Sequence, residues 1–235
     1  MQNRILALIY RILALAQMVI CLYVNMGFYY EGKLNTHSLL FFTILSNVYV
    51  TLHFLALVIM TIVDLFKRGI RGYTTTHRFI RGSMNICITL THLVYHWILV
   101  PDCRRRNLRV SPYFEIQSYP DLSAHYYSCL VALIDYFLFT PKNTYTLLEP
   151  IKWLGPVFVY AVFVMVRPYV SDTKVTELSR YPYFFVDVDM FGYPKVFAMM
   201  FGIFVLLTML GYVFVAIDRV SFRNGKLTWE KVKKD

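Results

Sequence analysis

Residues 39–66 read LLFFTILSNVYVTLHFLALVIMTIVDLF, an apolar run whose only Asp, Glu, Lys or Arg side chain is Asp64. An α-helix rises about 1.5 Å per residue, and the hydrocarbon core of a bilayer is about 30 Å thick, so about 20 apolar residues can span it. This run is long enough to cross a membrane, and it decides the fold class.

Working outward, five more apolar runs are bounded by charged or proline-containing segments. We predict membrane-spanning helices at about residues 12–29, 39–66, 83–100, 124–139, 150–166 and 194–218, with Pro101, Pro141 and Pro168 closing the third, fourth and fifth. Charged residues make up 16% of the chain, against about 25% in soluble domains. The sequence therefore predicts an all-α, polytopic integral membrane bundle. We expect a single membrane domain over residues 1–235, with a basic tail at 219–235.

The net charge of +10 comes from Lys and Arg that cluster at the ends of the apolar runs. With the N-terminus in the cytoplasm, fifteen of them lie on the cytoplasmic side and nine on the other side. This bias predicts cytoplasmic N- and C-termini, although the run Arg104–Arg106 argues for the opposite orientation. Because this clustering explains the positive charge by membrane topology, we do not expect nucleic acid as a partner. We expect membrane lipid as the partner and the cell membrane as the location.

The cysteines form no metal or disulfide motif. Cys21, Cys87 and Cys129 lie inside apolar runs, Cys103 follows one, and no CxxC pair occurs, so neither a zinc knuckle nor a disulfide framework is indicated. We expect no cleavable signal peptide, because the first apolar run lacks a small-residue cleavage site and reads on as a full span.

Polar side chains form seams along three of the predicted helices. Residues three or four apart share a helix face. The seams consist of Thr43, Ser46 and Asn47 on the second helix, Asn85, Thr89, His92 and His96 on the third, and His125, Ser128 and Cys129 on the fourth, with Asp135 deeper near the edge of that face. Because polar groups in membrane helices face protein or water, we expect the seams to face one another.

The depth of three side chains in the membrane adds a second constraint. Thr43 and His125 lie in the first turn of their predicted helices, and His96 lies in the last turn of its own. Since consecutive helices run in opposite directions, all three fall in one layer at the same face of the membrane. Under the predicted topology this face is the outer leaflet.

Each of these residues also has a structural interpretation. Thr43 could bond to a carbonyl of its own helix, and Asn47 could join two helices. The histidines could satisfy buried or interfacial partners. Asp135 could belong to a structural ion pair rather than to a reactive centre.

A resemblance to a known family appears in several segments. Phe41–Asn47 (FFTILSN) resembles the Phe-Thr-x-x-Ser-Asn segment of the bacterial relatives of the androgen-induced membrane hydrolases. The spacing from His125 through Asp135 to Pro141-Lys142 is similar to the family's fourth helix. The 150–168 helix and the later RYPYFFVD segment at 180–187, followed by Gly192-Tyr193, resemble its later segments. The similarity runs in order from about residue 38 to about 215. One departure is Ser128-Cys129, where family members often carry a proline.

The resemblance implies an intramembrane hydrolase of lipid esters without a cofactor. Animal members of the family hydrolyse fatty acid esters of hydroxy fatty acids with a threonine nucleophile and a histidine. By this resemblance Thr43 is the nucleophile and His125 is the histidine, and a lipid-like ester is the expected substrate.

The residue chemistry is compatible with that activity. A threonine hydroxyl needs a base to take its proton, and a neutral imidazole can act as base and later as acid. Ser46, Asn47 or a protonated His96 are candidate donors to an oxyanion. Asp135 cannot orient His125, because ten helical residues span about 15 Å. Asp187 or a backbone carbonyl would have to do so.

Two other function classes remain open. His92 and His96 have the i, i+4 spacing of zinc ligands, and His125 could supply a third nitrogen, which would make the protein a zinc-dependent membrane hydrolase. Alternatively, the polar core could be the path of an amphipathic ligand in a non-enzymatic binder or transporter. Inverted repeats would favour a transporter, and the sequence contains none that we detect.

Overall fold

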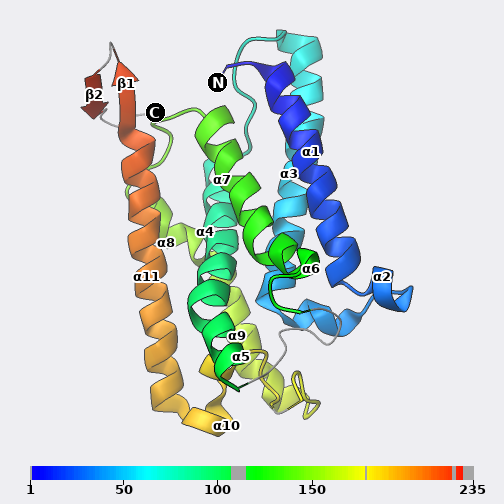
Figure 1. Ribbon diagram of the computed structural model, residues 1–235. Helices are drawn as coiled ribbons and strands as arrows, with labels where there is room; N and C mark the ends of the chain where they lie inside the picture. Colours follow the sequence, from blue (N-terminus) through cyan, green and yellow to red (C-terminus); the bar gives the residue numbers. More distant parts are fainter. Residues whose placement is uncertain (1, 107–114, 178, 224–225, 230–235) are drawn as a thin grey trace. The chain divides into compact units, whose positions relative to one another are not determined.

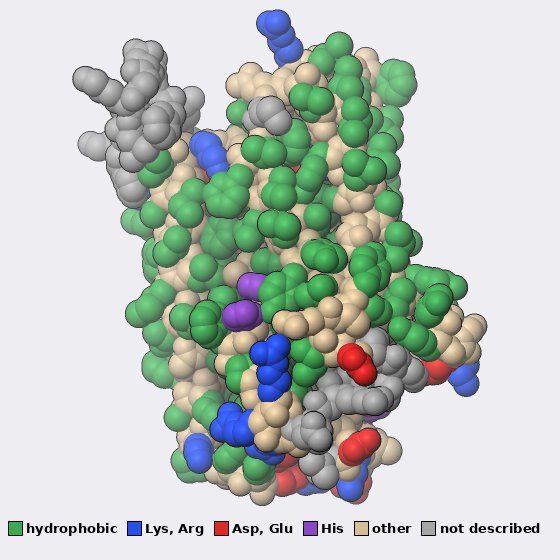
Figure 2. Space-filling model, in the orientation of Figure 1, with side chains coloured by type: hydrophobic (Ala, Val, Ile, Leu, Met, Phe, Trp, Pro, Cys, Tyr) green, Lys and Arg blue, Asp and Glu red, His purple; other side chains and the backbone are tan. Residues whose placement is uncertain are grey.

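The computed structural model describes residues 2–106, 115–177, 179–223 and 226–229. Within these residues six helices are long and apolar enough to cross a membrane: Arg4–Asn25, Phe42–Arg68, Arg78–Arg106, Tyr119–Phe139, Glu149–Val170 and Tyr193–Arg219. The prediction of a polytopic helical membrane protein is therefore confirmed. Figure 2 shows hydrophobic side chains covering most of the visible helical surface, as contact with lipid requires.

The chain divides into two compact units, Met1–Lys142 and Asn143–Asp235. The described elements of the first are α1 (Arg4–Asn25), α2 (Phe28–Glu31), the 3-10 helix η1 (Thr36–Leu40), α3 (Phe42–Arg68), α4 (Arg78–Val94), the π-helix η2 (Tyr95–Leu99), α5 (Val100–Arg106), α6 (Tyr119–Leu122), the π-helix η3 (Ser123–Tyr127) and α7 (Ser128–Phe139).

The described elements of the second unit are α8 (Glu149–Trp153), α9 (Gly155–Val170), the 3-10 helix η4 (Phe184–Val186), α10 (Val188–Phe191), α11 (Tyr193–Arg219) and the strands β1 (Val220–Arg223) and β2 (Lys226–Trp229). The two strands pair antiparallel. They form a short hairpin at the start of the predicted basic tail, whose residues 224–225 and 230–235 lie outside the described residues.

The first unit is a bundle of four spans. Helix α1 packs against α3 and α7, and α4 packs against α3 and α7, as Figure 1 shows. The buried side chains between them are Ala14, Met18, Val50, Phe54, Met84, Ile88, Cys129 and Ala132. The backbone N–H of Arg4 donates to the carbonyl of Ile70 (2.9 Å), so the start of α1 lies beside the end of α3. The opposite ends of these helices carry the candidate site.

The first span starts at Arg4, eight residues before the predicted start at residue 12. Asn3 caps the helix by accepting from the backbone N–H groups of Ile5 and Leu6 (3.0 and 3.1 Å). The Arg4 guanidinium is buried and donates to the carbonyls of Gly69 and Arg71 (2.8 and 2.6 Å). The prediction was wrong because it placed this arginine outside the apolar span, whereas backbone carbonyls of the α3–α4 connection satisfy its charge.

The predicted ends at Pro101 and Pro168 were also wrong. The third span continues to Arg106 because a π-helix, in which the N–H of Val100 donates to Tyr95 O, precedes Pro101. The proline then lies in the first turn of α5, where it is tolerated. In the fifth span Pro168 lies inside the last turn of α9, which ends at Val170.

In the second unit, α11 packs closely on α8 at a glycine. A Cβ atom built on Gly211 would lie 2.8 Å from Pro150 Cβ and 3.2 Å from Pro150 Cα, whereas one on Gly202 would meet nothing within 4 Å. Gly211 thus allows the backbone of α11 to approach the start of α8.

We expect Gly211→Ala to be less stable than Gly202→Ala by about 1–3 kcal/mol, the usual cost of overpacking. Both variants gain the same helix propensity from alanine, so the difference isolates the contact with Pro150. The free energy of unfolding in detergent micelles measures it. Equal stabilities of the two variants would contradict the packing argument.

Candidate active site

The three polar seams meet at one end of the first unit. The Ser46 hydroxyl of α3 lies 2.7 Å from the Thr91 hydroxyl of α4. The Asn47 amide nitrogen donates to the carbonyl of Ala124 in η3 (3.0 Å). The Nδ1 atom of His92 lies 3.0 Å from the His125 carbonyl oxygen. These contacts join α3, α4 and η3, although Thr91 and the Ala124 carbonyl are not members of the predicted seams. The Cys129 thiol and the Thr89 hydroxyl, 3.9 Å apart, join two of the seams directly.

Asn47 links the two residues that the resemblance singles out. Its side chain is fully buried, and its amide nitrogen donates to the carbonyl of Thr43 (2.7 Å) as well as to that of Ala124, the residue before His125. One amide group thus holds the backbone of Thr43 beside the backbone that carries His125. Thr43 itself is half-buried in the first turn of α3.

His125 lies in the π-helix η3, with only 5% of its surface exposed. Its Nδ1 atom is 2.9 Å from the backbone carbonyl oxygen of Asp121 and 3.1 Å from Oδ1 of the same residue. The ring of Tyr95 stacks on the imidazole at a centroid distance of 3.7 Å and an angle of 16°. Because the Asp121 carbonyl can only accept, this contact requires a hydrogen on Nδ1, and a neutral ring would then have its lone pair on Nε2.

Asp121 is the residue that the sequence analysis missed. It is fully buried, and its Oδ2 accepts hydrogen bonds from the Tyr95 hydroxyl and from the backbone N–H of Gln117 (2.7 Å). Gln117 has a φ of 66°, a left-handed conformation that is uncommon for a residue other than glycine. The predicted fourth helix starts at residue 124 and so leaves Asp121 outside it, but the span begins at Tyr119. The i, i+4 spacing of Asp121 and His125 was the available signal.

Both walls of the site contain a π-helix. Helix η2 carries Tyr95 and His96, and helix η3 carries His125 and Tyr126. A π turn inserts one residue into an α-helix and rotates the faces that follow, and such turns occur frequently at functional sites. Here Tyr95 of η2 stacks on His125 of η3, and His92 contacts the carbonyl of His125.

The other two histidines bond to groups on η3. His96 Nδ1 lies 2.7 Å from the Tyr126 hydroxyl, and the His92 and His96 rings stack at 6.0 Å. His92 faces the carbonyl of His125 rather than its ring. Among the described residues no group of three His, Cys, Asp or Glu side chains is arranged to hold a metal ion. The geometry therefore adds nothing in favour of the zinc alternative.

Asp135 takes part in a buried ion pair away from this cluster. Its Oδ1 is 2.8 Å from Arg11 Nε, and Arg11 also donates to the Thr61 hydroxyl at 2.8 Å. Arg11 and Thr61 are fully buried. The pair ties α1, α3 and α7 together, which agrees with the structural interpretation of Asp135.

Asp187 lies in the second unit and caps a helix there. Its Oδ1 accepts from the N–H of Met190 at the start of α10 (3.0 Å), and its Oδ2 accepts from the Ser179 hydroxyl (2.5 Å). In the segment 180–187 the neighbouring Arg180 donates to Asp189 (2.8 Å), a bond that raises the pKa of the guanidinium. These bonds shape the connection between α9 and α11.

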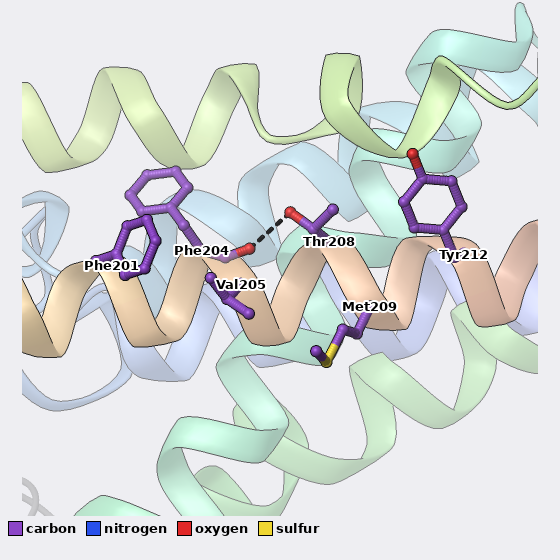
Figure 3. Close-up of a pocket in the computed structure, with 6 residues that line it drawn as sticks. All are labelled: Phe201, Phe204, Val205, Thr208, Met209 and Tyr212. Carbon is purple, nitrogen blue, oxygen red and sulfur yellow. Dashed lines mark hydrogen bonds between the residues drawn. The ribbon is translucent and has the colours of Figure 1, made fainter.

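A shallow groove of about 340 Å³ lies on α11. Figure 3 shows its lining, which comes from that one helix: Phe201, Phe204, Val205, Thr208, Met209 and Tyr212. The Thr208 hydroxyl, its central polar group, donates to the carbonyl of Phe204 (2.7 Å). The groove is an apolar surface feature of a membrane span, and the residues of the polar seams lie in the first unit.

Comparison of the chain with protein-family models, with curated proteins and with solved structures found no match.

Proposed function

We propose that this protein hydrolyses a lipid-like ester within the membrane, with Thr43 as the nucleophile and His125 as the general base. The observation that carries the proposal is the Asn47 amide, which donates to Thr43 O and to Ala124 O. Through it, the backbone of Thr43 at the start of α3 is joined to the backbone of Ala124, the residue before the buried His125. A nucleophile and a base brought together from two helices are the minimum that acyl transfer needs.

The proposed reaction has two steps. His125 Nε2 takes the proton of the Thr43 hydroxyl as Oγ1 attacks the ester carbonyl, and the imidazolium then protonates the leaving alcohol. This leaves an acyl group on Thr43. In the second step His125 takes a proton from water, the hydroxide attacks the acyl carbon, and Thr43 leaves with the proton from the imidazolium. The products are a carboxylic acid and an alcohol.

In this proposal Asn47 positions the nucleophile rather than binding the oxyanion, because both of its amide hydrogens are donated to carbonyls. Ser46 likewise contacts the Thr43 carbonyl (3.0 Å) and Thr91. His96, which is exposed at the surface of η2, remains the candidate donor.

The substrate class follows from the position of the cluster and from the resemblance. The cluster lies at one end of membrane-spanning helices, where an acyl chain can arrive laterally from lipid. Fatty acid esters of hydroxy fatty acids are the substrates that the resemblance implies. Cytoplasmic termini would place the cluster in the outer leaflet of the cell membrane, and this orientation is part of the proposal.

The test is ester hydrolysis by the purified full chain in detergent or vesicles. Removing either the nucleophile or the base should lower kcat by at least about 1,000-fold, so we expect Thr43→Ala and His125→Ala to be inactive yet folded. Matched controls are Thr51→Ala, two turns along the same helix, and His37→Ala, which lies outside the span at the surface. Both controls should keep their activity.

Three outcomes would count against the proposal. Retained turnover in both Thr43→Ala and His125→Ala would exclude the assigned roles. Stoichiometric zinc together with loss of activity in chelator would favour the metal-dependent alternative. Tight binding of the ester without turnover would favour the non-enzymatic binder.

A further inference from the structure

We propose that Asp121 is a positioning residue that holds His125 in the tautomer a general base requires. The expected effect of Asp121 on catalysis rests on the proposed function, whereas its expected effect on the tautomer of the His125 ring does not. The inference follows from how the two carboxylate oxygens of Asp121 are used in the fully buried site.

The Oδ2 atom of Asp121 faces two hydrogen-bond donors. The Gln117 backbone N–H donates to it at 2.7 Å, and the Tyr95 hydroxyl donates to it as well. The left-handed backbone of Gln117 directs this N–H toward the carboxylate. Two donors of this kind fix which oxygen of the carboxylate faces away from His125.

The Oδ1 atom of Asp121 faces His125. It lies 3.1 Å from Nδ1, within ion-pair distance, and accepts no hydrogen bond among the described residues. The backbone carbonyl oxygen of Asp121 lies 2.9 Å from the same nitrogen. The carbonyl therefore accepts the Nδ1 hydrogen, and the carboxylate beside it favours a hydrogen on that nitrogen electrostatically. The lone pair of the neutral ring is then on Nε2.

Tyr95 supports this arrangement from above. Its ring stacks on the imidazole at 3.7 Å while its hydroxyl bonds to Asp121. The same side chain thus covers one face of the imidazole and holds the carboxylate that orients it. Because Asp121 and Tyr95 are both buried, water does not compete for these bonds.

The substitution Asp121→Asn keeps the shape of the side chain but replaces one carboxylate oxygen with an NH₂ donor. The amide oxygen of the asparagine must face the two donors, Tyr95 and Gln117, which leaves its NH₂ group facing Nδ1 of His125. A donor facing Nδ1 disfavours a hydrogen there, in competition with the backbone carbonyl that accepts it, and so shifts the ring toward the tautomer with the hydrogen on Nε2. That ring cannot take the proton of Thr43 at Nε2. In serine proteases the equivalent change lowers kcat by about 10,000-fold for this reason.

Two readouts on the full chain in detergent test the inference. The first is the ring tautomer of His125 from nitrogen chemical shifts of isotope-labelled histidine at pH 8, assigned by comparison with His125→Gln. We expect the hydrogen on Nδ1 in the parent protein and a shift toward Nε2 in Asp121→Asn. The second is ester hydrolysis, in which Asp121→Asn should lower kcat by about 100-fold or more with KM unchanged.

The matched control is Asp102→Asn, another buried aspartate, which pairs with Arg106 on α5. This variant should keep both the tautomer of His125 and the kcat of the parent protein. A parent protein with the hydrogen on Nε2 overturns the inference even if Asp121→Asn fails to fold. An Asp121→Asn variant with the parent's tautomer or kcat also overturns it. If the parent protein hydrolyses no ester, the proposed function fails, while the tautomer still decides the role of Asp121.

Discussion

Asp135→Asn is expected to lower the free energy of unfolding by about 3–5 kcal/mol, because it leaves the Arg11 charge buried without its counterion. Arg11 is fully buried, its Nε lies 2.8 Å from Asp135, and the Thr61 hydroxyl is its other described side-chain hydrogen-bond partner. Inside a membrane bundle, water also does not hydrate the unpaired guanidinium. Reversible unfolding in mixed detergent micelles measures the change.

Two further variants show whether the lost counterion is the cause. The double replacement Arg11→Met with Asp135→Leu removes both charges and should recover most of the lost stability, since apolar pairs often replace buried ion pairs at little cost. Asp102→Asn breaks an ion pair with the part-exposed Arg106 and should change stability by less than about 1 kcal/mol. A loss in Asp135→Asn no larger than in Asp102→Asn would show that the pair is not a structural clamp.

Asn47→Ala should lower the kcat of ester hydrolysis by about 100-fold, because a displacement of about 1 Å between reacting groups has an effect of that size. The substitution removes the amide that joins the carbonyls of Thr43 and Ala124. The effect on stability should be smaller, about 1 kcal/mol, as is typical of interhelical hydrogen bonds in membranes. Steady-state kinetics and unfolding of the same preparation separate the two.

Asn85→Ala is the matched control for this experiment. Asn85 is also buried, but its amide nitrogen donates to Arg81 O in its own helix (2.9 Å). We expect the kcat of Asn85→Ala to stay within a few-fold of the parent value, because the hydrogen bond that it loses lies within one helix. If the two asparagine variants lost activity equally, Asn47 would have no special role in placing Thr43 beside His125.

The candidate site was predicted only in part. Residue spacing predicted polar seams that face one another, and the contact between Cys129 and Thr89 joins two of them, whereas Ser46 meets Thr91, which lies outside the predicted seams. The partner of His125 was anticipated as a backbone carbonyl or Asp187. The carbonyl is that of Asp121, whose carboxylate also lies beside the ring, while Asp187 caps α10 in the second unit. The missing information was the start of the fourth span.

The sequence by itself determined the six spans and the common end of the polar seams, because both depend on local quantities: the length of apolar runs and the 100° step of a helix. Tertiary structure alone decided which charges enter the bundle. Arg4 and Arg11 are buried because carbonyls of the α3–α4 connection and Asp135 meet them there. It also decided the π turns at Tyr95 and His125, since a turn that gives up α-helical bonds is stabilised by contacts that form only when distant segments pack, such as Tyr95 with Asp121.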